Sequence, residues 1–221
     1  MMQSLNGFLK RCRSLPALAL ACGLIFGLGC DGGGGGGGGG DDIGDNNAGV
    51  FIALGDSITQ GRCVPAGAPY PDRVASTYSV TVINSGSCGE TSGGGASRVG
   101  SLLAQHKPEG VFILYGANDV IQGRSLDGTI ANLRSIIQAV KGNQSRAIIA
   151  DLTPMYDGHA IFQPLVETLN PMIKSLASQE GAKFVSLSRE FGQERALIQA
   201  DGLHPSDLGT QAIAFAFGDR I

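Results

Sequence analysis

The decisive stretch of this chain reads VFIALGDSITQG, residues 50–61. Five consecutive apolar residues, from Val50 to Leu54, lead directly into Gly55, Asp56 and Ser57. A short unbroken apolar run is typical of a strand that is buried on both faces, as the strands of parallel sheets are. Four similar runs follow, at residues 80–83, 111–114, 147–150 and 184–187. The sequence therefore predicts five buried strands.

Segments with helical periodicity separate these strands. Residues 131–140 carry apolar side chains at the spacing of one helix face, at Leu133, Ile136, Ile137 and Val140. Comparable patterns occupy residues 69–78, 95–106, 162–180 and 206–217. We expect Pro171 to kink or interrupt the helix at residues 162–180. Repeated strand–helix alternation predicts an α/β fold in which helices cover both faces of a parallel sheet.

The first 30 residues have the pattern of an export signal. Three basic residues within positions 10–13 precede an apolar stretch at residues 15–30, which is shorter than the ~20 residues of a spanning helix. The stretch ends at Cys30 after a small residue and resembles a bacterial lipoprotein signal, in which this cysteine is lipidated. An uncleaved anchor and ordinary secretion are the alternatives, and Cys22 ends a weaker competing site. We expect residues 1–30 to be a signal peptide and the protein to be an exported, membrane-tethered lipoprotein that faces the periplasm or the cell exterior.

Composition narrows the class of partner. The chain has 221 residues, of which 16% are charged, and its formal net charge is −3. No Lys/Arg-rich stripe follows residue 13, so we expect no nucleic-acid partner, because such a partner requires a basic face. No set of His, Cys and Asp residues has the spacing of metal ligands, so we expect no metal and no other cofactor. Residues 31–49 contain a run of nine glycines and predict a flexible linker before a folded domain at residues 50–221.

Side chains with hydroxyl, imidazole and carboxylate groups lie at the ends of the predicted strands and just before the last predicted helix. Ser57 follows the first strand, and Asp201 and His204 stand just before residues 206–217. Ligand sites of open parallel sheets lie at the carboxyl ends of the strands. Imidazole is suited to taking a serine proton near neutral pH, and a carboxylate that accepts from the ring fixes its tautomer. Ser57, His204 and Asp201 are therefore candidates for a nucleophile, its base and the partner of that base.

The other two histidines have different surroundings. His106 lies near a helix end, and we expect it to serve that helix terminus. His159 lies in the loop after the fourth strand, where it could touch a substrate. We expect substrate choice to depend on the loops after strands three and four, and the candidate residues there are Tyr115, Tyr156 and His159.

A reaction of this kind also needs donors for a developing oxyanion. The backbone N–H groups of Ser57 and Gly89 and the side-chain amide of Asn118 are candidates from three neighbouring loops. Losing one such donor typically lowers the rate by 10² to 10³. We expect Asp56 and Asp119 to brace their loops, since the mechanism is complete without them.

Four short blocks resemble the SGNH (GDSL) hydrolase family, in matching order across about residues 50–217. They are Gly55-Asp56-Ser57, Asn84-Ser85-Gly86-Ser87-Cys88-Gly89, Gly116-Ala117-Asn118-Asp119 and Asp201-Gly202-Leu203-His204-Pro205. The resemblance implies a flavodoxin-like three-layer α/β/α sandwich with five parallel strands. It also implies metal-independent ester hydrolysis with Ser57 as nucleophile, His204 as base, Asp201 as its partner, and Ser57, Gly89 and Asn118 as oxyanion hole.

Residues 89–92 and 102–108 are similar to the bacterial arylesterase, acyl-thioesterase and lysophospholipase branch of that family. We therefore expect a serine esterase that hydrolyses short-chain acyl or aryl (thio)esters or lysophospholipids through an acyl-enzyme intermediate. A carbohydrate O-acetylesterase acting on envelope polysaccharide is the alternative, and a non-catalytic envelope binding module is a remote one. Cys63 and Cys88 follow the first two strands and either form a disulfide or remain free thiols.

Overall fold

Five parallel strands form one sheet in the order β2-β1-β3-β4-β5. The computed structural model describes residues 43–62, 64 and 68–221, all of them in the unit Asp42–Ile221. The strands are β1 (Asn47–Gly55), β2 (Thr81–Gly86), β3 (Pro108–Leu114), β4 (Arg146–Ala150) and β5 (Lys183–Val185). Each contains residues of one predicted apolar run, and the order is that of flavodoxin-like sheets, so the predicted fold class is confirmed.

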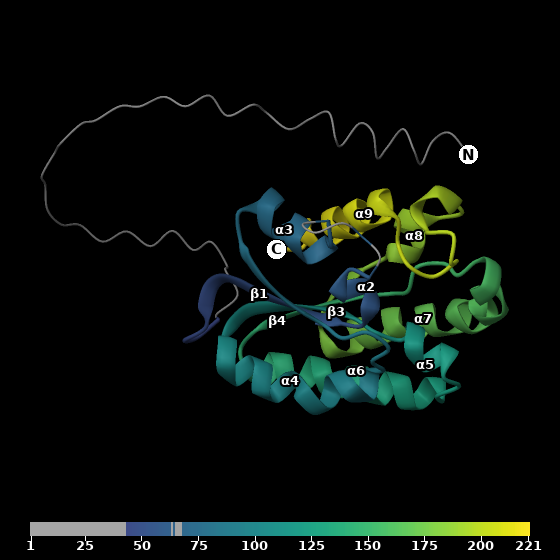
Figure 1. Ribbon diagram of the computed structural model, residues 1–221. Helices are drawn as coiled ribbons and strands as arrows, with labels where there is room; N and C mark the ends of the chain where they lie inside the picture. The colour runs from purple at the N-terminus through teal and green to yellow at the C-terminus, as the bar shows by residue number, and fades with distance from the viewer. Residues whose placement is uncertain (1–42, 63, 65–67) are drawn as a thin grey trace, which may run out of the picture. The chain divides into compact units, whose positions relative to one another are not determined.

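Helices cover both faces of this sheet (Figure 1). On one face lie α3 (Tyr70–Tyr78), α8 (Leu187–Phe191) and α9 (Asp207–Gly218). On the other lie α4 (Ser92–His106), α5 (Ala117–Ile121), α6 (Leu126–Gly142) and α7 (Gln163–Glu180). The remaining elements are α2 (Ser57–Gln60) and the 3₁₀ helices η1 (Asp157–Phe162) and η2 (Arg195–Leu197). Among the described residues, no helix combines the length and the apolar character needed to cross a membrane.

The core between β1, β3 and α9 is aromatic. The rings of Phe51 and Phe112 stack with centroids 5.2 Å apart, and Phe217 lies 5.1 Å from Phe112. Tyr70 of α3 stacks on Phe217 at 5.3 Å, and all four residues are buried. Aromatic pairs at such distances add to the free energy of burial. The first and third strands, whose ends carry polar residues of the candidate site, are thus anchored in the centre of the domain.

Several predicted bounds differ from the structure; the run at 184–187, for example, forms a strand only as far as Val185, and Leu187 begins α8. The first strand begins at Asn47, not at residue 50, because the Asn47 N–H and side chain donate to the carbonyls of Lys107 and His106. Helix α7 runs through Pro171 without interruption. Pro171 and Glu167 are both exposed, so the carbonyl that loses its helical partner can be hydrated. The predicted signal peptide with Cys30, the linker as far as residue 42, and Cys63 lie outside the described residues.

Candidate active site

Ser57 is the first residue of α2, directly after the sharp turn that follows β1, and is 5% exposed. Asp56 caps the short helix, since its Oδ1 accepts the Ile58 N–H at 2.9 Å. Gly55 permits a close approach to the neighbouring strand, because a Cβ there would lie 2.7 Å from the Leu114 carbonyl oxygen. The turn therefore presents the Ser57 hydroxyl at the carboxyl edge of the sheet.

Ser57, His204 and Asp201 form a continuous hydrogen-bonded chain. His204 Nε2 lies 3.0 Å from Ser57 Oγ, and His204 Nδ1 lies 2.5 Å from Asp201 Oδ2. The other carboxylate oxygen, Asp201 Oδ1, accepts the N–H groups of Leu203 and His204, each at 3.0 Å. The structure thus brings together the three side chains that the sequence proposed as nucleophile, base and partner.

The pKa values of the Asp201 and Asp56 carboxyl groups are shifted in opposite directions. Burial acts to raise the pKa of Asp201, but the hydrogen bonds from Leu203 and His204 outweigh it and lower that pKa below its ordinary value. Burial raises the pKa of Asp56 to about 7, and the nearby Asp119 carboxylate adds to the rise. Asp201 is therefore suited to remain ionised and hold the imidazole ring, whereas Asp56 gains a proton far more easily.

The Asp201–His204 turn is held by the loop after β4. His159 Nδ1 lies 2.8 Å from the Asp201 carbonyl oxygen, and the Tyr156 N–H donates to the Gly202 carbonyl at 2.8 Å. Arg195 lies over the Tyr156 ring, 5.4 Å from its centroid. Tyr156 and His159 therefore position the turn that carries Asp201, and their predicted contact with a substrate stays a prediction.

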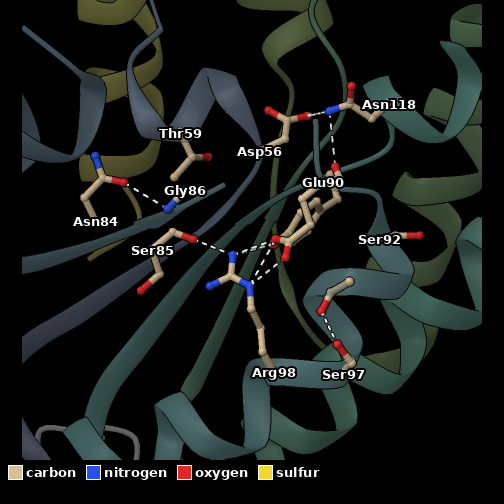
Figure 2. Close-up of polar contacts among 12 residues, drawn as sticks. Asp56, Thr59, Asn84, Ser85, Gly86, Glu90, Ser92, Ser97, Arg98 and Asn118 are labelled. Carbon is tan, nitrogen blue, oxygen red and sulfur yellow. Dashed lines mark hydrogen bonds and ion pairs between the residues drawn. The ribbon is translucent and has the colours of Figure 1, made fainter. Parts of the chain in front are cut away.

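The predicted oxyanion donors lie in the segments that directly follow β1, β2 and β3. Asn118 Nδ2 donates to Asp56 Oδ2 at 3.1 Å and to the Glu90 carbonyl at 3.2 Å (Figure 2). These partners directly adjoin Ser57 and Gly89 in the chain, so the Asn118 amide lies between the two loops that bear the other donors. Gly89 has a φ of 76° and nothing within 4 Å of a Cβ position. Its carbonyl accepts from Gln122 Nε2 at 3.0 Å, which orients the peptide.

Asp119 makes the contacts of a loop brace. Its carboxylate accepts the Ser92 N–H at 2.9 Å, the Ser92 hydroxyl at 2.6 Å and the Thr129 hydroxyl at 3.3 Å. All three residues are buried. The short helix α5, which carries both Asn118 and Asp119, is thereby fixed to the first turn of α4.

A model of the GDSL-like lipase/acylhydrolase family matches residues 53–212. The chain belongs to this family. The predicted resemblance to SGNH (GDSL) hydrolases is therefore confirmed, and the chain has the α/β fold of these enzymes.

Curated relatives in the family carry esterase names. Esterase TesA of Pseudomonas aeruginosa is 31% identical over 132 residues, which are 58% of this chain and 63% of that protein. Thioesterase 1/protease 1/lysophospholipase L1 of Escherichia coli K12 is 31% identical over 107 residues, 48% of this chain and 51% of that protein. Arylesterase of Vibrio mimicus is 31% identical over 107 residues, covering 46% and 54%. The chain thus spans from about half to just under two thirds of the length of these relatives.

Solved structures share the fold over a greater length. The crystal structure of TesA has a TM-score of 0.66 at 22% identity and covers 76% of this chain and 94% of that one. The lipase/acylhydrolase from Enterococcus faecalis has a TM-score of 0.69 at 22% identity, with coverage of 78% and 94%. At such identities the likeness concerns the fold.

One prediction for the family site needs correction. Tyr115 was expected in a substrate loop, but it is 1% exposed, and its hydroxyl bonds to Glu90 and Arg98. The phenol is directed inward because its oxygen finds partly buried partners there. Sequence reasoning assigned no role to Glu90 or Arg98. The three-glycine run at 93–95 could have drawn attention to them. Glycines inside a helix are unfavourable, and they usually indicate that neighbouring side chains need the space.

Two further residues have defined places. His106 lies in the last turn of α4, as expected of a residue serving that helix end. Cys88 is exposed, and its sulfur lies 3.4 Å from Arg62 Nη1. Because Cys63 lies outside the described residues, the disulfide between the two remains a prediction.

Proposed function

We propose that the protein is a serine ester hydrolase that works through an acyl-enzyme intermediate. The observation that carries this proposal is the 3.0 Å approach of His204 Nε2 to Ser57 Oγ, with His204 Nδ1 held at 2.5 Å by Asp201. A hydroxyl in contact with an oriented imidazole is the arrangement that activates a serine nucleophile. The family membership supports the same reaction class.

The geometry suits two half-reactions. Ser57 Oγ attacks the ester carbonyl carbon while its proton moves to His204 Nε2, and the carbonyl oxygen becomes an oxyanion. The leaving alcohol or thiol takes that proton as its bond to carbon breaks. Water then repeats the attack on the acyl-enzyme, again losing its proton to His204, and the acid product leaves as Ser57 regains its hydrogen.

The oxyanion is assigned to the N–H groups of Ser57 and Gly89 and to the Asn118 amide. In the structure both hydrogens of Asn118 Nδ2 have partners, the Asp56 carboxyl and the Glu90 carbonyl. A developing negative charge is a stronger acceptor than a neutral carbonyl. We therefore propose that Asn118 shares one of these hydrogens with the oxyanion during the reaction.

We propose short-chain acyl, aryl or thioester substrates or lysophospholipids, which are small molecules with an apolar acyl or aryl part. The names of the relatives in P. aeruginosa, E. coli and V. mimicus support this class. The loop that contacts Asp201 also carries Ile161, which is 78% exposed, and Leu165 follows it at 43%. Apolar side chains exposed on the segment that contacts the Asp201–His204 turn favour apolar substrate chains.

We also propose that the protein is exported and anchored through lipid at Cys30. The basic residues at 10–13, the apolar stretch at 15–30 and the small residue before Cys30 support this. Mass spectrometry of the mature N-terminus after expression in a bacterial host would show a lipid-modified Cys30. An unmodified Cys30 in the purified membrane fraction would contradict the proposal.

The central experiment is an ester panel assayed with wild type, Ser57→Ala and a matched control, Ser97→Ala. Ser97 is an exposed serine of α4 whose hydroxyl bonds only locally, to the Gly94 carbonyl. The panel contains p-nitrophenyl esters of increasing chain length, an acyl-CoA, lysophosphatidylcholine and an acetylated glycan. We expect Ser57→Ala to lose at least about 10³-fold in kcat, and the control to lose none. Turnover by Ser57→Ala beyond a contaminant's level would contradict the proposal, and a preference for acetylated glycan would favour the O-acetylesterase.

A further inference from the structure

The loop between β2 and α4 carries Gly89, and one side chain of α4, Arg98, holds it at both ends. Arg98 Nη2 donates at 2.5 Å to the carbonyl of Ser85, near the end of β2. The same guanidinium bonds the Glu90 carboxylate through Nε at 3.0 Å and through Nη2 at 2.7 Å. Figure 2 shows the guanidinium between these two attachment points. The span from Ser85 to Glu90 is therefore set by a planar, multidentate group.

Glu90 connects this attachment to the proposed oxyanion donors. Its carbonyl accepts from Asn118 Nδ2 at 3.2 Å, and its N–H donates to the Ser87 carbonyl at 3.1 Å. Gly89 immediately precedes it in the chain and has a left-handed φ of 76° without a side chain to restrain it. A rotation of the Glu90 backbone would therefore shift the peptide that joins it to Gly89 and the carbonyl that accepts from Asn118.

Tyr115, which directly follows β3, completes the arrangement. Its hydroxyl lies 2.5 Å from Glu90 Oε2 and 2.9 Å from Arg98 Nη2. Burial, together with the Glu90 carboxylate, raises the pKa of Tyr115 well above its ordinary value, so the phenol remains a donor. Glu90 and Arg98 have only 16% and 27% of their side chains exposed. The contacts are thus largely shielded from water. Hydrogen bonds of this kind are stronger in such a shielded place than in water.

The glycine run of α4 makes room for these side chains. A Cβ at Gly94 would lie 2.6 Å from Glu90 Cγ, and one at Gly95 would lie 2.6 Å from Tyr115 Cζ. At Gly93 the nearest atom would be 3.4 Å away, which is an ordinary contact. Glycine inside a helix is unfavourable relative to alanine. Helix propensity is therefore given up at Gly94 and Gly95, where Glu90 and Tyr115 need the space.

We propose that Glu90, Arg98 and Tyr115 act together as positioning residues, which hold the Gly89 N–H and the Asn118 amide in place for the oxyanion. We call these three residues the loop clamp. The proposal rests on the proposed function and adds a role for side chains that touch neither the substrate nor Ser57. The clamp acts on a charge that exists only in the transition state, so its loss lowers kcat and leaves KM nearly unchanged.

Arg98→Ala is the main test, with Arg134→Ala as the matched control. Arg134 forms an ion pair of the same type with Glu180, between α6 and α7. On a p-nitrophenyl ester we expect Arg98→Ala to lower kcat by about 10- to 100-fold, because displaced donors cost less than the 10² to 10³ of a deleted one. KM is expected to change by less than about twofold. Millimolar guanidinium should restore part of the kcat of Arg98→Ala and should not affect Arg134→Ala.

Gentler variants guard against a general loss of folding. Tyr115→Phe keeps the ring and removes only the hydroxyl contacts, and Gly95→Ala is compared with Gly93→Ala in the same helix turn. All assays are run at a temperature at which circular dichroism shows each variant to be fully folded. We expect Tyr115→Phe and Gly95→Ala to lower kcat, and Gly93→Ala to leave it unchanged.

Amide hydrogen exchange of Gly89 and Glu90 supplies a readout that does not depend on activity. The loop clamp predicts faster exchange at both amides in Arg98→Ala and not in Arg134→Ala. The proposal is overturned if exchange is unchanged, or if kcat of Arg98→Ala equals that of Arg134→Ala while turnover depends on Ser57. If turnover does not depend on Ser57 but exchange still rises, the proposed function fails and the structural basis of the clamp stands.

Discussion

Replacing Gly202 by alanine tests how the Asp201–His204 turn is held against the loop after β4. Gly202 has a φ of 77°, and a Cβ there would lie 2.6 Å from the Tyr156 carbonyl carbon and still closer to its oxygen. Carbon atoms in contact are about 3.5–4.0 Å apart, so Tyr156 and Gly202 must separate by about 1 Å. The Tyr156 N–H to Gly202 carbonyl bond, 2.8 Å long, would then no longer be a hydrogen bond.

The expected loss in the free energy of unfolding of Gly202→Ala has two contributions. A left-handed backbone costs about 1–2 kcal/mol for a residue with a Cβ, and forcing a methyl group against a backbone carbonyl costs about 1–3 kcal/mol. Together they lower the free energy of unfolding by roughly 2–5 kcal/mol, or the Tm by about 2–4 °C for each kcal/mol. Because a displacement of about 1 Å can cost about 10²-fold in rate, kcat should fall by that order.

Variants of two other glycines separate the backbone contribution from that of the contact with Tyr156. Gly123 has a φ of 67° with nothing within 4 Å of a Cβ, so Gly123→Ala carries the backbone cost alone. Gly158 has neither a left-handed φ nor a close neighbour, so Gly158→Ala should carry no cost. Thermal unfolding and ester turnover of all three variants are the measurements. If Gly202→Ala unfolds at the same temperature as Gly123→Ala and keeps its kcat, the Tyr156 contact does not hold the turn.

Three further predictions concern single side chains. The pKa of Asp56 is raised from 3.8 to about 7 in the folded protein, so the folded state binds more protons than the unfolded state between these pH values. The contribution of Asp56 to the free energy of unfolding therefore falls as pH rises through that window. Urea titrations at several pH values should show that the free energy of unfolding of Asp56→Asn depends less steeply on pH than that of the wild type. Asp201→Asn keeps the Oδ1 acceptor but mismatches His204 Nδ1, so kcat should fall by about 10³- to 10⁴-fold with little change in Tm, and an unchanged kcat would remove Asp201 from the mechanism. Ile161→Ser should leave Tm within about 1–2 °C while raising KM for a decanoyl ester roughly tenfold relative to a butyryl ester; equal KM values would exclude Ile161 from chain binding.

The sheet could be predicted from sequence because its strands are buried on both faces. Runs such as Val111–Leu114 need no partner to be recognised, since apolar side chains on both faces leave an unbroken pattern. The start of β1 could not be predicted, because Asn47 and Gly49 are polar or small and pair through contacts far away in the chain. The Gly49 N–H, for example, donates to Glu109 Oε2. The length of a strand cannot be predicted from an apolar pattern where hydrogen bonds to distant residues, and not buried side chains, hold the strand in the sheet.

The proposed triad could be found in sequence because its chemistry requires particular side chains. Ser57, Asp201 and His204 follow from nucleophile, base and partner logic, even though 147 residues separate Ser57 from His204. Glu90 and Arg98 could not be found in this way, since a charged pair in a sequence is usually a solvated surface pair. Only the fold shows that Arg98 reaches under the loop to Ser85 and Glu90 at once.

The two halves of the site are assembled by different means. Parallel register places Gly55 of β1 beside Gly86 of β2 and Leu114 of β3, so the loops that carry Ser57, Gly89 and Asn118 leave the sheet at one level. The turn with Asp201 and His204 has no such support from the sheet. It depends on hydrogen bonds between loops, from His159 and Tyr156 and from the short bridge between Ile198 and Pro205. The core therefore preassembles the proposed nucleophile and oxyanion donors, while the proposed base is docked onto them through loop contacts. We expect the alignment of His204 to be the more sensitive to substitutions far from Ser57.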